Sequence, residues 1–148
     1  MSETRISFLL NNLVREMNRQ ADALLGLKFG ITYNQFVFLL KLKDAATIDI
    51  TRLAESLGVT KGAVSKRLSW FVERDLVKTS QAENNAKRVL VSLKPNGEEL
   101  VVAAGNYLER KFLASASHNP DLDMDFLRIE IQKMLGVLLT KSAPGEKS

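Results

Sequence analysis

Apolar residues recur at helical spacing along most of this chain, with polar residues between them. From Arg5 to about Leu27, apolar side chains fall at positions 6, 9, 10, 13, 17, 21, 24 and 25, and this period predicts an amphipathic helix. Thr32 and Gln35 have the spacing of a capping box. A second helix is therefore expected to begin there and to end near Asp44.

The segment from Ile50 to Ser69 is typical of two short helices joined by a tight turn. Helices are expected over about 51–57 and 61–74. Gly58 lies where the first of them must end, in a left-handed conformation that glycine adopts without a steric penalty. Thr60 is the expected N-cap of the second helix.

The spacing of small and apolar residues in this segment indicates a helix-turn-helix motif. Ala54 lets the two helices approach closely, Gly58 makes the turn four residues later, and Val64 packs the second helix onto the first. Such a motif commonly places its second helix in the DNA major groove. The polar side chains expected on the outward side of that helix are Lys61, Ser65, Lys66 and Ser69.

After the helix-turn-helix the apolar period changes to that of β-strands. Residues 76–80 and 88–93 predict a two-stranded hairpin. The polar stretch QAENNA is expected in a loop near 81–87, and Lys87 and Arg88 are expected at the tip. A basic hairpin directly after a helix-turn-helix is the expected wing of a winged helix.

Two more helices are predicted downstream of the hairpin. Pro95 suits the first position of a helix, which is expected over about 96–117, and a last helix is expected to start at Asn119–Asp121. Residues 122–139 are apolar around most of the helix circumference, which favours burial against a second chain. A strand of two or three residues is also expected further upstream, at Ile48–Ile50.

Composition excludes several classes of protein. Apolar residues make up 45% of the 148, enough for a core, and there is no cysteine. Disulfides, thiolate metal sites and cysteine redox sensing are thereby excluded. Unbroken apolar runs, such as Phe36 to Leu40, are far shorter than the ~20 residues of a membrane span. The N-terminus MSETRIS lacks the features of a secretory signal, so we expect a cytoplasmic protein without membrane contact.

Positive charge is concentrated in one segment of the chain. Residues 60–88 hold seven lysines and arginines against three carboxylates, a net charge of +4, and the whole chain also has a net charge of +4. Phosphate neutralisation supplies much of the affinity for nucleic acids, so a localised basic patch favours DNA binding. The alternative interpretation of such a cluster is a solvated charged face.

The ordered combination of these motifs resembles the MarR family of bacterial winged-helix transcription regulators. The similar segments are ITYNQFVFLLKL at 31–42, IDITRLAESLGVTKGAVSKRLSWFVERDLVK at 48–78 and RVLVSLKPNGEEL at 88–100. The family's wing usually carries an Asp-x-Arg pattern, whereas this chain has Asn85 and Lys87 at the matching positions. Asn and Lys cannot form the charged bidentate bond of an Asp–Arg pair.

The resemblance implies a mainly α protein with a small β-hairpin, in which a winged helix-turn-helix domain is flanked by N- and C-terminal dimerisation helices. The chain is expected to form a single domain, residues 1–148. The DNA-binding part is expected over about 32–94, and the dimerisation helices over about 3–27 and 96–141. Two recognition helices about 34 Å apart in a homodimer would read a near-palindrome.

Candidate DNA contacts follow from outward position and from chemistry. Ser65 and Lys66 are expected to reach base edges, with Lys61 and Arg67 beside them. Gly62 permits close approach to a phosphate. Thr60 either caps the helix alone or also contacts phosphate, and the basic residues could serve solubility only. Including the wing, the expected DNA-binding residues are Thr60, Lys61, Gly62, Ser65, Lys66, Arg67, Lys87 and Arg88.

The resemblance also implies a small, aromatic or anionic effector that releases DNA. The residues placed by helix position to face its cavity are Asn11, Arg15, Tyr33 and Phe36. For Phe36, core packing is the favoured alternative.

No catalytic or metal site is predicted. His118 is the only histidine, and a metal site needs several converging ligands, so His118 is expected at the surface or capping a helix end. No phosphate loop or nucleophile motif occurs. The sequence thus predicts a non-enzymatic, cofactor-free regulator, a homodimeric repressor of a near-palindromic operator that is relieved by a small-molecule ligand. The alternative is a winged helix used for protein–protein contact or dimerisation without operator binding.

Overall fold

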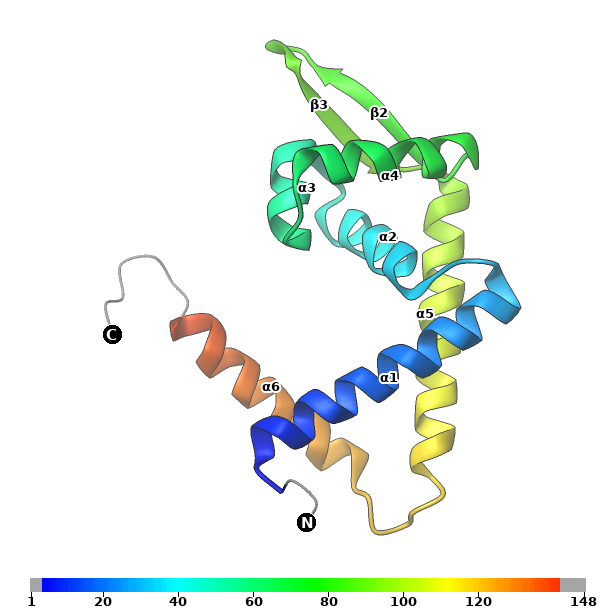
Figure 1. The fold of residues 1–148 in the computed structure, drawn as a ribbon, viewed down its shortest axis with the longest axis vertical. Coiled ribbons are helices and arrows are strands. Elements are labelled where there is room, and N and C mark those ends of the chain that lie inside the picture. Colours follow the sequence, from blue (N-terminus) through cyan, green and yellow to red (C-terminus); the bar gives the residue numbers. More distant parts are fainter. Residues whose placement is uncertain (1–3, 142–148) are drawn as a thin grey trace. The chain divides into compact units, whose positions relative to one another are not determined.

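The computed structural model describes residues 4–141, so the predicted single domain of residues 1–148 extends beyond the described residues at both ends. The chain divides into two compact units, Met1–Leu108 and Glu109–Ser148, each described by itself below. The elements, labelled in Figure 1, are α1 (Ile6–Phe29), α2 (Tyr33–Ala45), β1 (Thr47–Asp49), α3 (Ile50–Leu57), α4 (Lys61–Glu73), β2 (Val77–Ala82), β3 (Asn85–Leu93), α5 (Pro95–Ala116) and α6 (Met124–Lys141).

The first unit is a winged helix built on one apolar core, as the sequence predicts. Phe38 of α2 stacks on Phe71 of α4, with ring centroids 4.4 Å apart, and both rings are almost completely buried. Val91 of β3 and Val101 of α5 belong to the same core. These contacts fix α4 across α2 at one end of the unit, where the hairpin of β2 and β3 also projects (Figure 1).

The predicted caps of α2 and of the helix-turn-helix are confirmed. Thr32 Oγ1 accepts a hydrogen bond from the Gln35 N–H at 3.1 Å, and Gln35 Oε1 accepts one from the Thr32 N–H at 2.8 Å. Gly58 ends α3 with φ 66°, in the left-handed region. Thr60 Oγ1 accepts from the Ala63 N–H at 3.1 Å and so caps α4.

The wing differs from the sequence prediction in its length. The three strands form an antiparallel sheet in the order β1-β3-β2, which confirms a short strand beside the hairpin. The hairpin turns at 83–84 rather than through a loop at 81–87. Lys87 and Arg88 therefore lie within β3 and not at the tip. Polarity predicted a loop there, but an exposed hairpin arm has water on both faces and is polar as well.

In the second unit α6 begins later than the sequence predicts. It starts at Met124, because Asp123 Oδ1 accepts from the Phe126 N–H at 2.9 Å and caps the helix. Asn119 Oδ1 instead accepts from the Asp121 N–H at 3.0 Å, which makes a turn of the stretch predicted to start the helix. His118 Nδ1 lies 3.1 Å from the Ala114 and Ser115 carbonyl oxygens, so its predicted place at a helix end is confirmed.

Within residues 4–141 no single helix is long and apolar enough to cross a membrane. Taken together, α1 and α2 reach the required length and composition, but they are bent by 85° at the break between them.

Candidate nucleic-acid interface

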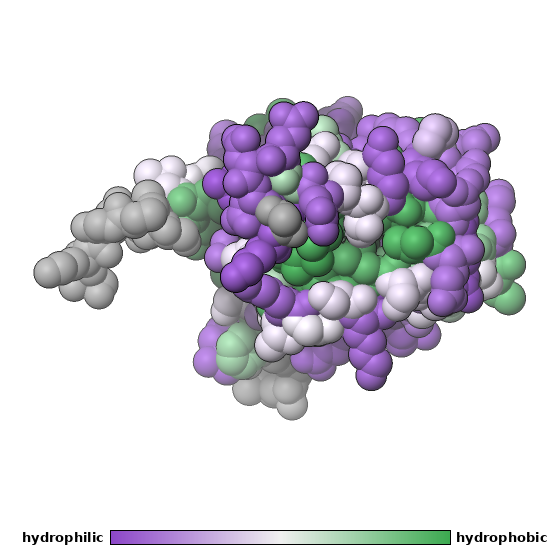
Figure 2. Space-filling model, turned by 90° about the horizontal axis from the view of Figure 1, so that it is seen from above, coloured by the Kyte–Doolittle hydropathy of each residue, from purple (hydrophilic) through white to green (hydrophobic). Residues whose placement is uncertain are grey.

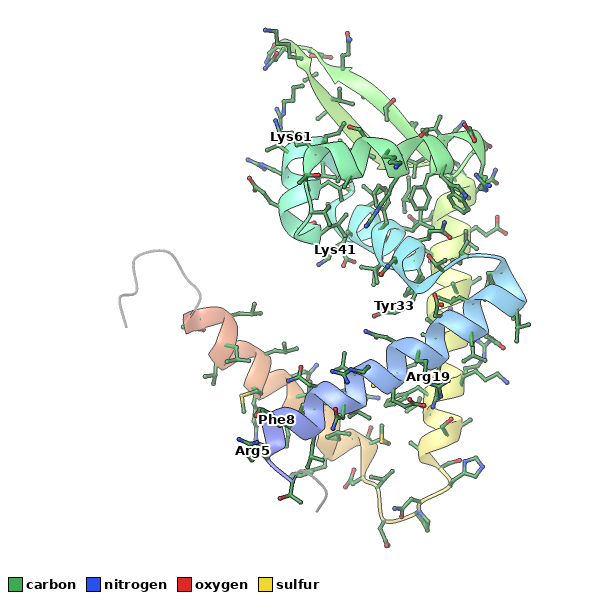
Figure 3. The ribbon with its side chains drawn as sticks, in the orientation of Figure 1. Arg5, Phe8, Arg19, Tyr33, Lys41 and Lys61 are labelled. Atoms are coloured by element: carbon green, nitrogen blue, oxygen red, sulfur yellow. The ribbon has the colours of Figure 1, made fainter. Side chains whose placement is uncertain are left out.

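One side of α4 packs into the apolar core, and the opposite side is exposed to solvent. Val64, Leu68 and Phe71 are buried. The predicted contact residues of this helix are exposed, and Lys61 lies at its N-terminal end (Figure 3). Seen from above, hydrophilic side chains cover most of the outer surface, and apolar residues show between them (Figure 2). The exposed candidates on and before α4 are Thr60, Lys61, Gly62, Ser65, Lys66 and Arg67.

The positive charges on this face are uncompensated. No ion pair within the described part of the chain involves Lys61, Lys66 or Arg67. A Cβ added at Gly62 would meet only Thr60 Oγ1, at 3.9 Å, so the first turn of α4 presents open backbone beside these lysines. Unpaired lysine and arginine beside a helix N-terminus suit the binding of phosphate groups.

The two basic residues of the wing have different surroundings. The Lys87 N–H donates to Asn85 Oδ1 at 3.0 Å, while the Lys87 side chain is exposed and takes part in no ion pair among the residues described. Arg88 Nε donates to Asp49 Oδ2 at 3.1 Å. The structure thus brings Arg88 to the start of α3.

Asp49 receives two donors at the junction of β1 and α3. Its Oδ1 accepts from the Arg52 N–H at 2.8 Å and so caps α3. This backbone hydrogen bond, and after it the Arg88 guanidinium, hold the pKa of Asp49 below its usual range. Asp49 is therefore a carboxylate at neutral pH, although its side chain is only 13% exposed.

Two exposed cations of the first unit were not among the predicted contact residues. Arg52 lies in the first turn of α3 and Lys78 on β2, and neither has an ion pair with another described residue. Arg52 precedes the basic segment 60–88, so the charge count over that segment does not include it. Its position three residues after the cap Asp49 is the signal that could have identified it.

The structure groups the four predicted effector residues into two pairs. Tyr33 and Phe36 lie together, with ring centroids 6.3 Å apart, and Phe36 is only 7% exposed and belongs to the core. Asn11 and Arg15 are exposed one turn apart on α1, and Asn11 Nδ2 donates to the Ser7 carbonyl oxygen at 2.9 Å. No hydrogen bond or ion pair in residues 4–141 joins the two pairs.

Arg15 differs from its neighbour Arg19 on α1. Arg19, labelled in Figure 3, forms an ion pair with Glu16 and, with Gln20, lowers the pKa of Glu16 to about 2. Arg15 has no ion pair in the described part of the chain. Of these two arginines, Arg15 is thus the one available to an anionic ligand.

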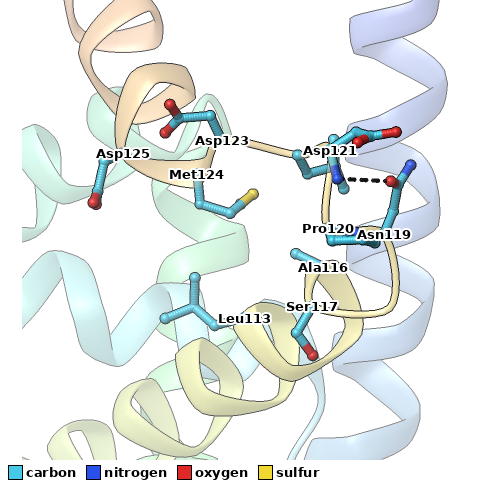
Figure 4. A pocket seen from close by; sticks show the side chains of 10 residues that line it. Leu113, Ala116, Ser117, Asn119, Pro120, Asp121, Asp123, Met124 and Asp125 are labelled. Atoms are coloured by element: carbon cyan, nitrogen blue, oxygen red, sulfur yellow. Dashed lines mark hydrogen bonds between the residues drawn. The ribbon is translucent and has the colours of Figure 1, made fainter.

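The second unit contains a cavity of about 560 Å³ between the end of α5 and the start of α6 (Figure 4). Its lining is both apolar and acidic, with Leu113 and Met124 beside Asp121, Asp123 and Asp125. The described residues include no group of three or more His, Cys, Asp or Glu arranged to hold a metal ion. None of the predicted effector residues lines this cavity.

Comparison with known proteins identifies relatives of this chain. Residues 31–89 match the model of the MarR family. The HTH-type transcriptional regulator MgrA of Staphylococcus aureus is 27% identical over 135 residues, which cover 91% of this chain and 88% of MgrA. The organic hydroperoxide resistance transcriptional regulator of Bacillus subtilis (strain 168) is 32% identical over 95 residues, 64% of each chain.

Solved structures share the fold over nearly the whole chain. Wild-type MarR from E. coli superposes with a TM-score of 0.72 at 22% identity, covering 97% of this chain and 100% of MarR. NadR in complex with 4-hydroxyphenylacetate gives 0.74 at 21% identity, with 99% and 97% covered. A mutant of S. aureus MepR bound to an oligodeoxyribonucleotide gives 0.64 at 22% identity, with 92% and 99% covered.

Proposed function

We propose that this chain is a winged helix-turn-helix transcription regulator of the MarR family, which the comparisons support, and that it binds double-stranded DNA as a homodimer. It represses transcription from a near-palindromic operator until a small ligand releases it. The observation that carries the proposal is the row of exposed, unpaired cations on α4, a helix held rigidly by buried residues on its other face. The relatives are transcription regulators, and the proposal involves no catalytic residue, metal or cofactor.

In this proposal α4 enters the major groove with its N-terminal half. Ser65 and Lys66 face base edges, where lysine donates to guanine O6 and N7. Lys61 and Arg67 neutralise phosphates on either side. The Gly62 backbone and the Thr60 hydroxyl lie at the start of the helix, where N–H groups favour an anion. Lys87 extends the contact from the wing.

Exposed apolar side chains on two helices support a homodimer. Large apolar patches on a soluble protein are normally covered by a partner. On α1 the exposed large apolar side chains are Ile6, Phe8, Leu9, Leu10, Leu13, Val14, Met17 and Leu27. On α6 they are Phe126, Ile129, Ile131, Met134, Leu135, Val137, Leu138 and Leu139. A second copy of the chain offers the same patches and so a matching surface.

The proposed effector is a small aromatic or anionic molecule. NadR has been crystallised with 4-hydroxyphenylacetate, an aromatic anion, and an arginine with an aromatic neighbour suits that chemistry. Arg15, which has no ion pair among the described residues, is our candidate for the anion, and Tyr33 is our candidate for the aromatic ring. Asn11 and the buried Phe36 are secondary candidates. The chain has no cysteine, so oxidation of a thiol is not the release signal.

Selection of bound sequences from random duplex DNA tests the operator. We expect an inverted repeat whose half-sites are centred about 10 base pairs apart, or a multiple of that. Selection of a single unpaired site would contradict the dimeric mode. Absence of any selected sequence would favour the alternative, a winged helix that serves protein–protein contact.

Alanine substitutions at Lys61, Lys66, Arg67 and Lys87 test the residues. Loss of a base contact should cost about 1–3 kcal/mol of binding free energy. Loss of a phosphate contact should reduce the slope of the logarithm of the binding constant against the logarithm of the salt concentration by about 1. Lys41→Ala, which removes an exposed lysine of α2 (Figure 3), serves as the control and should have little effect. Titrations followed by fluorescence anisotropy over a range of salt concentrations give both quantities. Unchanged affinity in all four variants would refute this interface.

A further inference from the structure

The pairing of the wing strands is interrupted where its basic residues lie. Gln81 pairs with Val89, but the next residue of β2, Ala82, pairs with Asn85. Among the pairs of described residues, Lys87 and Arg88 of β3 therefore have no partner on β2. A bulge of this kind bends a strand and redirects its side chains. Backbone pairing alone does not fix how this part of the wing is oriented.

The Arg88 side chain connects this stretch of β3 to β1, where the hydrogen-bonded pairing of β2 and β3 is interrupted. β1 ends at Asp49, which is opposite Leu90 of β3. Arg88 precedes Leu90 by two residues, so it is the diagonal neighbour of Asp49 across the two strands. Its Nε reaches back over the end of β1 to Asp49 Oδ2, at 3.1 Å. The ion pair thus joins the interrupted stretch of the wing to the sheet and to the first turn of α3.

The partner of Arg88 is itself fixed in position. Asp49 Oδ1 is held by the Arg52 N–H at the start of α3, and the Asp49 side chain is largely buried. At the other end, Asn85 Oδ1 accepts from the Lys87 N–H and shapes the backbone beside Lys87. Lys87 is the adjacent residue whose charge stays unpaired in the described chain.

We propose that Arg88 is a positioning residue of the wing, not a DNA contact: its ion pair with Asp49 holds Lys87 at a fixed place relative to the recognition helix. This inference rests on the proposed DNA-binding function. Arg88 and Asp49 take over the bracing of the wing in a chain whose Asn85 and Lys87 cannot form a charged pair with each other.

A double-mutant cycle between Asp49 and Arg88 tests the proposal. Asp49→Asn keeps a good N-cap for α3 but removes the ion pair, and Arg88→Gln removes it from the other side. Glu83→Gln is the matched control, because it removes an exposed carboxylate from the turn of the wing. Loss of a negative charge near DNA strengthens binding by electrostatics alone, so the sign of the Asp49→Asn effect is decisive.

We expect Asp49→Asn and Arg88→Gln each to weaken binding to the selected duplex by about threefold or more, and the double variant to be no weaker than either single one. Glu83→Gln should bind as tightly as the unaltered protein or more tightly. Lys87→Ala should cost less affinity in the Arg88→Gln background than alone. Additive losses, or tighter binding by Asp49→Asn with weaker binding by Arg88→Gln, would overturn the proposal and make Arg88 a direct DNA contact.

Amide hydrogen exchange of the free protein tests the brace without DNA. Exchange at residues 82–88 should accelerate equally in Asp49→Asn and Arg88→Gln and stay unchanged in Glu83→Gln. Unchanged exchange in the first two variants would overturn the brace even if DNA binding is confirmed. If the unaltered protein selects no duplex while exchange follows this pattern, the proposed function fails and the brace stands.

Discussion

Gly97 shows how one residue sets the join between the winged helix and α5. A Cβ at this position would lie 2.1 Å from the carbonyl oxygen of Leu76 and 3.0 Å from its carbonyl carbon. That same oxygen accepts a hydrogen bond from the Lys94 N–H at 2.9 Å. The start of α5 therefore packs directly on the backbone that leads into β2, and only glycine leaves room for it.

Replacing Gly97 with alanine should destabilise the protein. The added methyl group overlaps a fixed backbone carbonyl, and overpacking of this kind typically costs about 1–3 kcal/mol. Gly105→Ala in the same helix is the control, because a Cβ there meets only Phe36, at 3.7 Å, and alanine favours helix by up to about 1 kcal/mol. Denaturant unfolding compares the two. Equal stability of both variants would contradict the close contact at Gly97.

Sequence reasoning found one of these glycine roles and missed the other for a physical reason. Gly58 follows an amphipathic helix and precedes a capping threonine, so local spacing alone reveals its left-handed conformation. Gly97 is needed because of Leu76, twenty-one positions earlier in the chain. No local pattern carries that contact. The same holds for Arg88, whose partner Asp49 is 39 positions away.

At the scale of elements, the turn between α4 and β2 is held to α5 by a carboxylate. Asp75 has a φ of 60°, in the left-handed region. Its carboxylate accepts hydrogen bonds from Lys94 Nζ and, at 2.9 Å, from Asn96 Nδ2. Lys94, and secondarily Asn96, hold the pKa of Asp75 below its usual range. The link thus depends on an ionised Asp75.

Acid should weaken this link. Because the pKa of Asp75 is lower in the folded than in the unfolded protein, its stabilising contribution is complete above the ordinary pKa of about 3.9. That contribution disappears as the pH falls through the lowered value. Asp75→Asn, which tolerates a positive φ, should be less stable at neutral pH and should lose less stability than the unaltered protein between about pH 5 and pH 2.

Denaturant unfolding over this pH range provides the measurement for Asp75. Asp44→Asn is the control, because Asp44 is exposed and has no hydrogen bond or ion pair with another described side chain. It should leave the pH dependence unchanged. A pH profile of Asp75→Asn that coincides with that of the unaltered protein would show that the Lys94 pair contributes nothing.

Element boundaries were predictable where side chains cap them and less so elsewhere. The capping box of α2 and the cap Thr60 are readable within four residues of sequence. The start of α6 was wrong by a few residues, because the run of Asp121, Asp123 and Asp125 offers several caps and only packing selects Asp123. The exposed side of α4 was predictable because it is the complement of a buried stripe, whereas strand pairing in the exposed wing leaves no such pattern.

At the scale of the whole molecule, the described chain leaves much apolar surface uncovered. Leu139 is 69% exposed and Phe126 60%, and the apolar residues of α6 surround the helix rather than forming one stripe. A helix of this kind is stable in water only when other surfaces cover it. The similarity to MarR-family regulators and this surface together favour assembly with a second copy, which would also place two recognition helices on one DNA.

A charge placed on α6 should therefore separate the subunits. We expect the unaltered protein to sediment as a dimer in analytical ultracentrifugation. Leu135→Glu should shift it towards the monomer, because an unpaired carboxylate in an apolar interface costs several kcal/mol. Gln132→Glu adds the same charge at an exposed polar position of the same helix and should stay dimeric.

The monomeric variant should bind a palindromic operator scarcely better than a half-site, since it no longer links two recognition helices about 34 Å apart. If Leu135→Glu stays dimeric and keeps its operator affinity, α6 is not the surface that joins the subunits.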